Sequence, residues 1–267
     1  MVHLSDAGIA GFRTPEACAD AIRAWRDWRA PRPEPAVDAA RVTAARALLG
    51  AKQRLNELDA CRVFAKLGVP AAPSETITVP EQGVRLEFPV VAKILSPDIT
   101  HKTDAGGVIA NIASADALKR AAAAILQNVR VKAPQARVNG ILVQRMEKGL
   151  AEVILGYRRD PQVGPVVMLG AGGVLAEIYR DFALRLAPVT EEEAAHMIEE
   201  VKGLAVIRGY RNLPRGDTVA LARAVSAFSA LAHVDSRVME AEVNPLIVKP
   251  EGEGVVAVDG LLVLADN

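Results

Sequence analysis

The segment that most constrains the fold is Val90-Val-Ala-Lys93-Ile-Leu-Ser-Pro-Asp-Ile-Thr-His101-Lys-Thr-Asp-Ala-Gly106-Gly107-Val-Ile. The β-branched residues before Lys93 and after Gly107 predict two buried strands. Pro97 and the polar residues around it interrupt the apolar pattern between these strands. The segment therefore predicts a strand that ends in a lysine, a polar loop that carries a histidine, and a Gly-Gly turn into a second strand.

Three features of this segment suit the binding of an anion such as phosphate. The Lys93 ammonium supplies a positive charge, and the small size of Gly106 and Gly107 lets backbone N–H groups approach anionic oxygens. His101 is largely neutral near pH 7 and is nucleophilic in that form. Taken one at a time, the same residues are also explained as a surface lysine, a hairpin turn and a solvated histidine.

Composition excludes several classes of protein. Of the 267 residues, 51% are hydrophobic and 24% charged, which is typical of a globular chain with a large core. The 32 basic and 32 acidic residues balance, and aromatic residues make up 4%, so neither nucleic acid nor a membrane is an expected partner. The longest uncharged run, residues 161–176, is broken by Pro and Gly and is too short for a membrane span.

The two cysteines, Cys18 and Cys61, have no CxxC spacing, and no signal peptide precedes them. This usage predicts a cytoplasmic protein whose thiols are structural.

Hydrophobic periodicity and helix-capping residues predict a mixture of helices and strands, in the α+β (α/β) class. Helices are expected at 14–28, 37–49, 55–68, 113–130, 190–204 and 217–232. In addition to the two strands around His101, strands are expected at 75–79, 141–146, 151–157, 166–170, 181–188, 238–248 and 255–259. Alternating prolines at residues 30–36 predict a semi-rigid linker after the first helix.

Oxygen-bearing side chains gather in the last two predicted strands. Glu242 and Asn244 alternate on one strand face, and Asp259 is expected on the next strand, after a turn. Adjacent antiparallel strands would bring these side chains together, and such oxygen ligands suit Mg²⁺ shared with nucleotide phosphates. Polar residues at strand ends explain the pair equally if it is taken alone. The order of a lysine and glycine loop followed by acidic ligands favours a nucleotide held between two α+β lobes.

Other familiar motifs are absent or incomplete. Gly170-Ala-Gly172-Gly173 begins like a dinucleotide-binding loop, but the third glycine position is Leu175. The sequence contains no GxxxxGK[ST] loop, no serine nucleophile elbow and no HExxH motif. The remaining histidines are isolated and are expected to be structural or solvated, namely His3, His196 and His233.

A series of segments between residues 54 and 262 resembles the ATP-grasp (β-type) part of NDP-forming acyl-CoA synthetases. This is the ADP-forming acetate–CoA ligase group, which is related to the succinyl-CoA synthetase β subunit. The matching segments are Phe88-Pro-Val-Val-Ala-Lys93, Ser96-Pro-Asp-Ile-Thr-His101-Lys-Thr-Asp-Ala-Gly-Gly-Val108, Glu152-Val-Ile-Leu-Gly156, Arg159-Asp-Pro-Gln-Val-Gly-Pro165, Gly170-Ala-Gly-Gly-Val-Leu-Ala-Glu177, Asp181-Phe-Ala-Leu-Arg185-Leu-Ala-Pro188 and Glu242-Val-Asn-Pro-Leu246.

The resemblance implies the ATP-grasp fold, in which nucleotide lies between two lobes of mixed sheet and helices. It implies an ATP-grasp domain at residues 54–265, with a smaller nucleotide lobe at 69–143 and a larger lobe at 144–265. Residues 31–53 would form a Pro-rich linker and a helix. Residues 1–30, which include Gly8-Ile-Ala-Gly-Phe-Arg-Thr-Pro-Glu, resemble the tail of the family's preceding CoA-ligase module.

The resemblance also implies roles for individual residues. His101 matches the histidine that in this family accepts phosphate, after a first histidine on an α-type partner. Asn244 and Asp259 would hold Mg²⁺. The residues expected to bind ATP or ADP are Lys93, Gly106, Gly107, Gln144, Arg145, Met146 and Glu152, of which Gln144 to Met146 would line the hinge beside adenine.

Two positions depart from the family pattern. The family usually has glutamate after the hinge glutamine, where this chain has Arg145. An arginine commonly follows the terminal aspartate segment, where this chain continues Gly260-Leu-Leu-Val. These departures concern nucleotide choice and a phosphate contact, and they leave the metal ligands in place.

The expected function is that of the nucleotide-binding subunit of an acyl-CoA synthetase, with the reaction acid + CoA + ATP ⇌ acyl-CoA + ADP + phosphate. The α-type subunit, a separate chain in a hetero-oligomer, would bind CoA and the acid. One alternative is a regulatory nucleotide-sensing domain, which would have no need of His101 as a phosphoryl acceptor. Another is a carboxylate–amine ligase of the wider ATP-grasp class, which would use an acyl phosphate without a histidine.

Overall fold

The computed structural model describes residues 6–28, 33–99, 101–173 and 181–265. The chain divides into two compact units, Met1–Glu34 and Pro35–Asn267. Residues 174–177 of the Gly170–Glu177 segment, which include Leu175, lie outside the described residues.

The first unit contains helix α2 (Pro15–Asp27), where the sequence predicts a helix. Thr14 caps it, because its hydroxyl accepts a hydrogen bond from the Ala17 N–H. None of its residues is buried, and Trp25 and Trp28 are both exposed.

The second unit contains a six-stranded sheet with the order β10-β8-β5-β6-β7 and with β9 paired to β8. We call it the large sheet, and every pair of its strands is antiparallel. Its strands are β5 (Ala151–Asp160), β6 (Gly164–Ala171), β7 (Phe182–Leu186), β8 (Val238–Val248), β9 (Val255–Ala257) and β10 (Gly260–Leu264).

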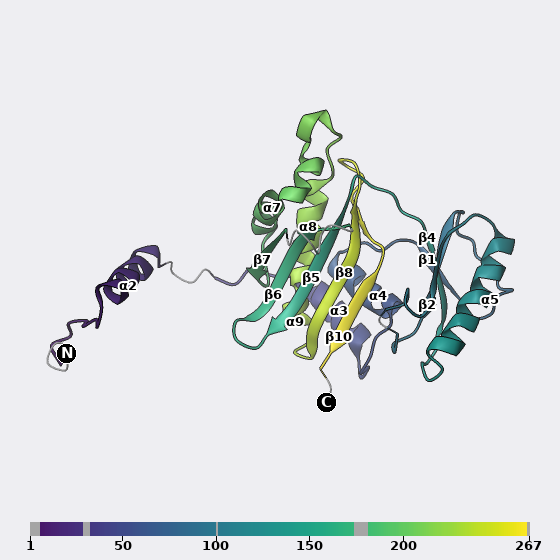
Figure 1. The fold of residues 1–267 in the computed structure, drawn as a ribbon, viewed down its shortest axis with the longest axis horizontal. Helices are drawn as coiled ribbons and strands as arrows, with labels where there is room; N and C mark the ends of the chain where they lie inside the picture. The colour runs from purple at the N-terminus through teal and green to yellow at the C-terminus, as the bar shows by residue number, and fades with distance from the viewer. Residues whose placement is uncertain (1–5, 29–32, 100, 174–180, 266–267) are drawn as a thin grey trace. The chain divides into compact units, whose positions relative to one another are not determined.

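Helices pack on one face of the large sheet (Figure 1). They are α3 (Ala39–Leu49), α4 (Glu57–Leu67), α7 (Glu191–Glu200), α8 (Thr218–Ser229) and α9 (Leu231–Val234), with 3-10 helices η1 (Lys202–Arg208) and η2 (Tyr210–Asn212) after α7. Their apolar faces and the inward side chains of the strands form one core, in which the Phe64 and Phe228 rings meet edge to face at 5.1 Å. Burial of this apolar surface is the main stabilising contribution to the unit.

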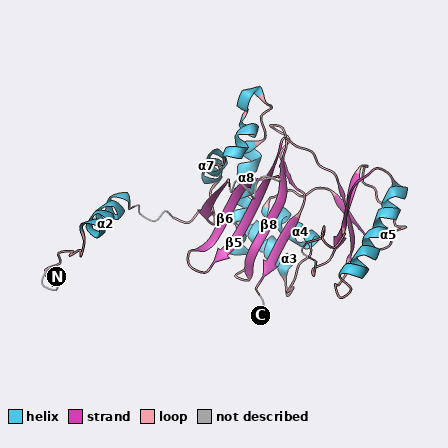
Figure 2. Ribbon diagram, in the orientation of Figure 1, coloured by secondary structure: helices cyan, strands magenta, loops and turns pink. Residues whose placement is uncertain are grey.

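A second, small sheet has the order β1-β4-β2-β3, with β1 (Ser74–Ile77), β2 (Val90–Leu95), β3 (Val108–Ile112) and β4 (Gly140–Arg145). Helix α5 (Ala115–Lys132), capped by Ser114, covers one face of it (Figure 2). Among the described residues, no helix is long and apolar enough to cross a membrane.

The opposite face of the small sheet carries polar side chains that are also buried. Side chains alternate along a strand, so Val91, Lys93, Leu142 and Gln144 point away from α5. All four are buried, with Lys93 5% and Gln144 2% exposed. Lys93 contacts Glu57 of α4, so this face lies against the part of the unit built on the large sheet.

The structure confirms a mixed α+β fold and differs from the predicted elements in two places near the candidate site. β2 continues past Lys93 to Leu95, because Ile94 and Leu95 still pair with β4. The strand predicted at 255–259 is divided, because β9 and β10 pair with different parts of β8 and the chain turns between them at Val258 and Asp259.

Candidate active site

One cavity of about 600 Å³ brings together residues that the sequence places far apart. It is lined by His101 and Lys102 from the loop between β2 and β3, and by Asn244 and Asp259 from the end of the chain. The other lining residues are Leu55, Asn56, Glu57, Ser96, Pro97, Ile99, Glu240, Glu242, Gly260 and Leu261. The candidate phosphate acceptor and the two candidate metal ligands therefore share one cavity.

Asn244 and Asp259 are neighbours, as the antiparallel pairing predicts. The Asn244 N–H donates to the Asp259 carbonyl oxygen at 3.3 Å. Asp259 is not within a strand, however, but in the short junction between β9 and β10. Its Oδ1 accepts a hydrogen bond from the Gly260 N–H at 2.8 Å, which orients the carboxylate at the cavity wall.

Lys93 lies inside β2 and not at the strand end that the sequence predicts. Its ammonium donates to Glu57 Oε1 at 2.7 Å and to the Val258 carbonyl oxygen at 2.8 Å. Asp259 Oδ2 lies 3.7 Å away. In this conformation the charge that would bind phosphate is neutralised by protein oxygens, because an unpaired ammonium would be costly to bury.

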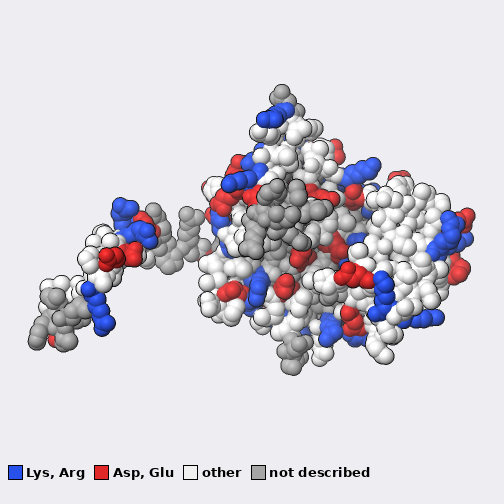
Figure 3. Space-filling model, in the orientation of Figure 1, with Lys and Arg blue, Asp and Glu red and all other residues white. Residues whose placement is uncertain are grey.

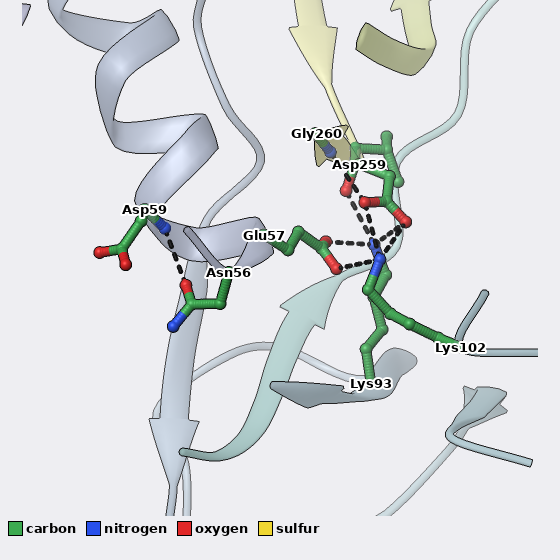
Figure 4. Close-up of polar contacts among 8 residues, drawn as sticks. Asn56, Glu57, Asp59, Lys93, Lys102, Asp259 and Gly260 are labelled. Carbon is green, nitrogen blue, oxygen red and sulfur yellow. Dashed lines mark hydrogen bonds and ion pairs between the residues drawn. The ribbon is translucent and has the colours of Figure 1, made fainter. Parts of the chain in front are cut away.

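Glu57 links two lysines, a role that no pattern in the sequence indicates. Asn56 caps α4, which makes Glu57 the first residue of the helix and directs it toward the small sheet. Its Oε2 lies 3.0 Å from the Lys102 ammonium, which contacts both Asp259 oxygens at 3.0 Å. Figure 4 shows Glu57, Lys93, Lys102 and Asp259 gathered around this point. We call these four residues the charged cluster.

Electrostatics in the charged cluster affect nearby groups. Burial alone would lower the pKa of Lys102, but the Glu57 and Asp259 carboxylates outweigh burial and raise that pKa, so Lys102 stays charged at neutral pH. Burial, followed by the charges of Glu57 and Asp259, raises the pKa of the Cys61 thiol to about 12. Cys61 therefore remains a protonated thiol, and neither it nor Cys18 forms a disulfide.

His101 is exposed and follows Thr100, which lies outside the described residues. The glycines that follow it serve the loop itself. The Gly106 N–H donates to the Thr103 carbonyl at 2.9 Å, and the Gly107 N–H donates to the Lys102 carbonyl at 2.7 Å. Neither amide is therefore free to bind an anion here, in contrast to the backbone cradle expected from the sequence. A side chain on Gly107 would lie 2.5 Å from Ile94, so packing also requires a glycine there.

The predicted hinge residues form a separate group at the end of β4. Gln144 is buried, and its Oε1 has no hydrogen-bond partner in the described part of the chain. Arg145 pairs with Glu147 at 2.6 Å, and Glu147 also pairs with Lys249 at 2.9 Å. The Met146 N–H donates to the Pro89 carbonyl at 3.4 Å. The positive charge of Arg145 is thus balanced by an acid two residues later.

Glu147→Gln is expected to lower the free energy of unfolding at pH 7 by about 1–2 kcal/mol, because it weakens the charge-assisted contacts of Glu147 with Arg145 and Lys249. Burial alone would raise the pKa of Glu147, but hydrogen bonds from Lys249 and Arg145 more than offset burial and lower it. The lowered pKa means that the contribution is complete above the ordinary value of 4.5 and is lost as pH falls through the folded-state pKa.

Urea unfolding of both proteins at several pH values measures this difference. The stability gap should be constant from pH 7 down to about pH 5 and should shrink below the ordinary glutamate pKa. A gap that grows on acidification would contradict the assignment.

Glu152 lines a different cavity, of about 540 Å³, together with Glu147, Gly172 and Gly173. The Gly172 N–H donates to the Glu152 carbonyl at 2.8 Å, and a side chain on Gly172 would lie 2.6 Å from that oxygen. The residues expected to bind nucleotide are therefore divided between this cavity, the hinge, the charged cluster and the turn at Gly106 and Gly107.

On the face drawn in Figure 3, acidic and basic side chains are interspersed over the described surface of the second unit. This distribution agrees with the equal numbers of acidic and basic residues in the sequence. Attraction of an anionic substrate would therefore depend on local groups such as Lys93 and Lys102.

The sequence of this chain is similar to known proteins over the residues that form the site. Residues 46–264 match the family model of the ATP-grasp domain. The chain is 36% identical over 214 residues to the acetate–CoA ligase (ADP-forming) I subunit beta of Pyrococcus furiosus, with 79% of this chain and 91% of that subunit covered. It is 38% identical over 207 residues to acetate–CoA ligase (ADP-forming) I of Archaeoglobus fulgidus, covering 73% of this chain and 30% of that longer protein.

The fold of this chain is also similar to that of solved structures of an acetyl-coenzyme A synthetase. Acetyl-coenzyme A synthetase 1 of Ca. Korarchaeum cryptofilum, in complex with coenzyme A and Ca-AMPCP, superposes with a TM-score of 0.76 and 34% identity over 85% of this chain and 100% of that chain. In another structure of that enzyme, with coenzyme A and Mg-AMPPCP, the phosphohistidine segment points towards the nucleotide-binding site; it superposes with a TM-score of 0.69 and 31% identity over the same shares of both chains.

The family match, residues 46–264, spans both sheets and the candidate site. The chain therefore belongs to the ATP-grasp family, in the group formed by the β subunits and β-type parts of ADP-forming acid–CoA ligases.

Proposed function

We propose that this chain is the nucleotide-binding subunit of an ADP-forming acid–CoA ligase and that it carries phosphate on His101. The observation that supports this most directly is the shared cavity, in which His101 lies with Lys102, Asn244 and Asp259. Such a cavity offers a nucleophile, a cation and oxygen ligands to one phosphoryl group. The family match supports the same role, because relatives that the chain covers almost completely are β subunits of such ligases.

Asn244 and Asp259 are the residues that would hold Mg²⁺. An amide and a carboxylate from neighbouring chain segments, with Glu242 on the same strand, fit a hard divalent cation that prefers oxygen ligands. Bound there, the cation would neutralise phosphate oxygens and so lower the barrier to transfer.

The nucleotide would be ATP in one direction and ADP in the other. Lys93 and Lys102 would exchange carboxylate partners for phosphate oxygens, which place the same negative charge beside the ammonium groups. The buried Gln144 Oε1 is an acceptor that the amino group of adenine would satisfy. Arg145, Met146 and Glu152 complete the proposed nucleotide contacts.

In the proposed chemical step, a neutral nitrogen of His101 attacks the γ-phosphorus of ATP. The N–P bond forms as the bond from phosphorus to the β–γ bridging oxygen breaks, and that electron pair leaves with ADP. The reverse step uses the same groups. Exposure of His101 suits both directions, because the phosphorylated side chain must then reach a second site.

That second site would lie on an α-type partner subunit that binds CoA and the acid. The Archaeoglobus relative is more than three times as long as the segment that matches this chain, so the remaining activities would reside outside it. A cytoplasmic location belongs to the same proposal, and the two unpaired cysteines are in keeping with it.

Incubation with [γ-³²P]ATP and Mg²⁺ tests the proposal. The wild-type chain, with the partner subunit present, is expected to acquire acid-labile, base-stable phosphate, and His101→Ala is expected to acquire none. His196→Ala, which removes an exposed histidine on α7, is the matched control and should label like the wild type. Absence of label from the wild type would contradict the proposed function.

A further inference from the structure

We propose that Lys102 competes with the divalent cation for the Asp259 carboxylate, so that cation binding loosens the loop that carries His101. This inference deepens the proposed function and rests on it in one respect, the assignment of Asp259 as a metal ligand. It gives Lys102 a positioning role.

The contacts of Asp259 show why the two cations exclude each other. The Lys102 ammonium lies 3.0 Å from both carboxylate oxygens of Asp259, the residue whose backbone carbonyl accepts from the Asn244 N–H. A divalent ion bound to the same oxygens would lie within a few ångströms of that ammonium. Two positive charges at such a distance in a partly buried site repel strongly, so one of them must withdraw.

Lys102 has a second partner that makes withdrawal feasible. Its ammonium lies 3.0 Å from Glu57 Oε2, and Glu57 is almost completely buried. Release from Asp259 therefore leaves Lys102 paired, and it removes one of the two links from this lysine to the large-sheet part of the unit. The other oxygen of that carboxylate, Glu57 Oε1, accepts from Lys93 in the same conformation.

The backbone transmits the change at Lys102 to His101, its immediate neighbour. The far half of the loop is held independently, because the Lys132 ammonium donates to the Asp104 carbonyl at 2.9 Å and the Asn128 amide donates to the Gly106 carbonyl at 3.1 Å. The half that carries His101 is tied to the far half by the bond from the Gly107 N–H to the Lys102 carbonyl, and to the cavity by the side chain of Lys102. His101 is therefore restrained most when no divalent cation is bound to the Asp259 carboxylate.

Mn²⁺ is a suitable probe, because the paramagnetic signal of the free ion measures binding without any reaction. Lys102→Met is expected to raise the affinity for Mn²⁺ about tenfold, the size of effect that one neighbouring charge has on a carboxylate. Lys102→Arg, which keeps the charge, should bind Mn²⁺ like the wild type. Lys132→Met is the matched control, since Lys132 holds the same loop without contacting Asp259. Equal or weaker Mn²⁺ binding by folded Lys102→Met would overturn the competition.

Hydrogen exchange tests the effect on the loop. In the wild type, saturating Mg²⁺ should increase amide exchange severalfold in peptides covering residues 101–105, where the Ala105 N–H bonds to the His101 carbonyl. In Lys102→Met the exchange should already be fast and should not respond to Mg²⁺. Slower exchange of the wild-type loop in Mg²⁺ would overturn the proposed loosening.

These results separate the inference from the proposed function. If His101 acquires phosphate but Lys102→Met leaves Mn²⁺ affinity unchanged, the competition fails alone. If Lys102→Met binds Mn²⁺ more tightly and His101 never acquires phosphate, the proposed function fails and the competition stands. If Asp259→Asn binds Mn²⁺ as tightly as the wild type does, Asp259 is not a metal ligand, and the assignment shared by the proposed function and the competition is wrong.

Discussion

Glu57→Gln is expected to lower the free energy of unfolding by about 3 kcal/mol, the lower end of the range for removing one partner of a buried ion pair. Its carboxylate is 1% exposed and contacts Lys93 at 2.7 Å and Lys102 at 3.0 Å. Glutamine keeps the shape and removes the charge, so two poorly hydrated ammonium groups would share the single carboxylate of Asp259. Urea unfolding followed by circular dichroism measures the loss, provided that the slope of the transition is unchanged.

Two further variants make this result specific. Glu251→Gln removes the same charge from an exposed turn and should change stability by less than about 0.5 kcal/mol. The double variant Glu57→Gln/Lys93→Met should lose less than the sum of the two single variants, because neither partner is then left buried and alone. A Glu57→Gln protein as stable as the Glu251→Gln control would show that the charged cluster contributes nothing to holding the small sheet in place.

Local sequence patterns predicted the parts of the fold that depend on neighbours along the chain. Thr14 and Ser114 cap helices where the sequence places helix starts, and the helix expected at 55–68 ends at Gly68 in a left-handed conformation. The resemblance to the ATP-grasp family is confirmed by the match over residues 46–264. Asn244 and Asp259 lie together because strand pairing follows from a short connection.

The charged cluster could not be predicted in the same way. Glu57 and Lys93 are 36 residues apart, in a helix and a strand that belong to different layers. An acidic residue in the first turn of a helix is already explained by the helix dipole, so Glu57 carried no signal of a second role. Lys102 lies beside His101 in the sequence, but only the position of Asp259 in space shows what its ammonium contacts.

Glycine pairs illustrate a further limit of sequence patterns. Gly106 and Gly107 suit a phosphate-binding turn by composition, yet their N–H groups close the loop after His101. Gly106 has a φ of 64°, and Gly107 lies against Ile94, so the turn explains both glycines without a ligand. Small residues indicate a close approach of backbone, and the sequence does not say to what.

Asp259→Asn is expected to slow Mg²⁺-dependent phosphorylation of His101 by about 10²–10³-fold, the usual effect of losing one group that stabilises transition-state charge. The substitution is nearly isosteric, and an amide oxygen can still accept the hydrogen bond from the Gly260 N–H. The junction between β9 and β10 should therefore keep its conformation. Single-turnover labelling with [γ-³²P]ATP measures the rate, and thermal unfolding verifies that the variant is folded.

Two comparisons test whether the slower phosphorylation of Asp259→Asn is due to the loss of a metal ligand. Glu253→Gln, in the exposed turn before β9, should label at the wild-type rate. In EDTA, Asp259→Asn should bind ATP at least as tightly as the wild type, because Lys102 and Lys93 lose one competing carboxylate. Weaker binding in EDTA would mean that Asp259 orients the lysines and does not act through a cation. A labelling rate within about threefold of the wild type would place the metal ligand elsewhere, since an interaction made in the transition state lowers the rate when it is removed.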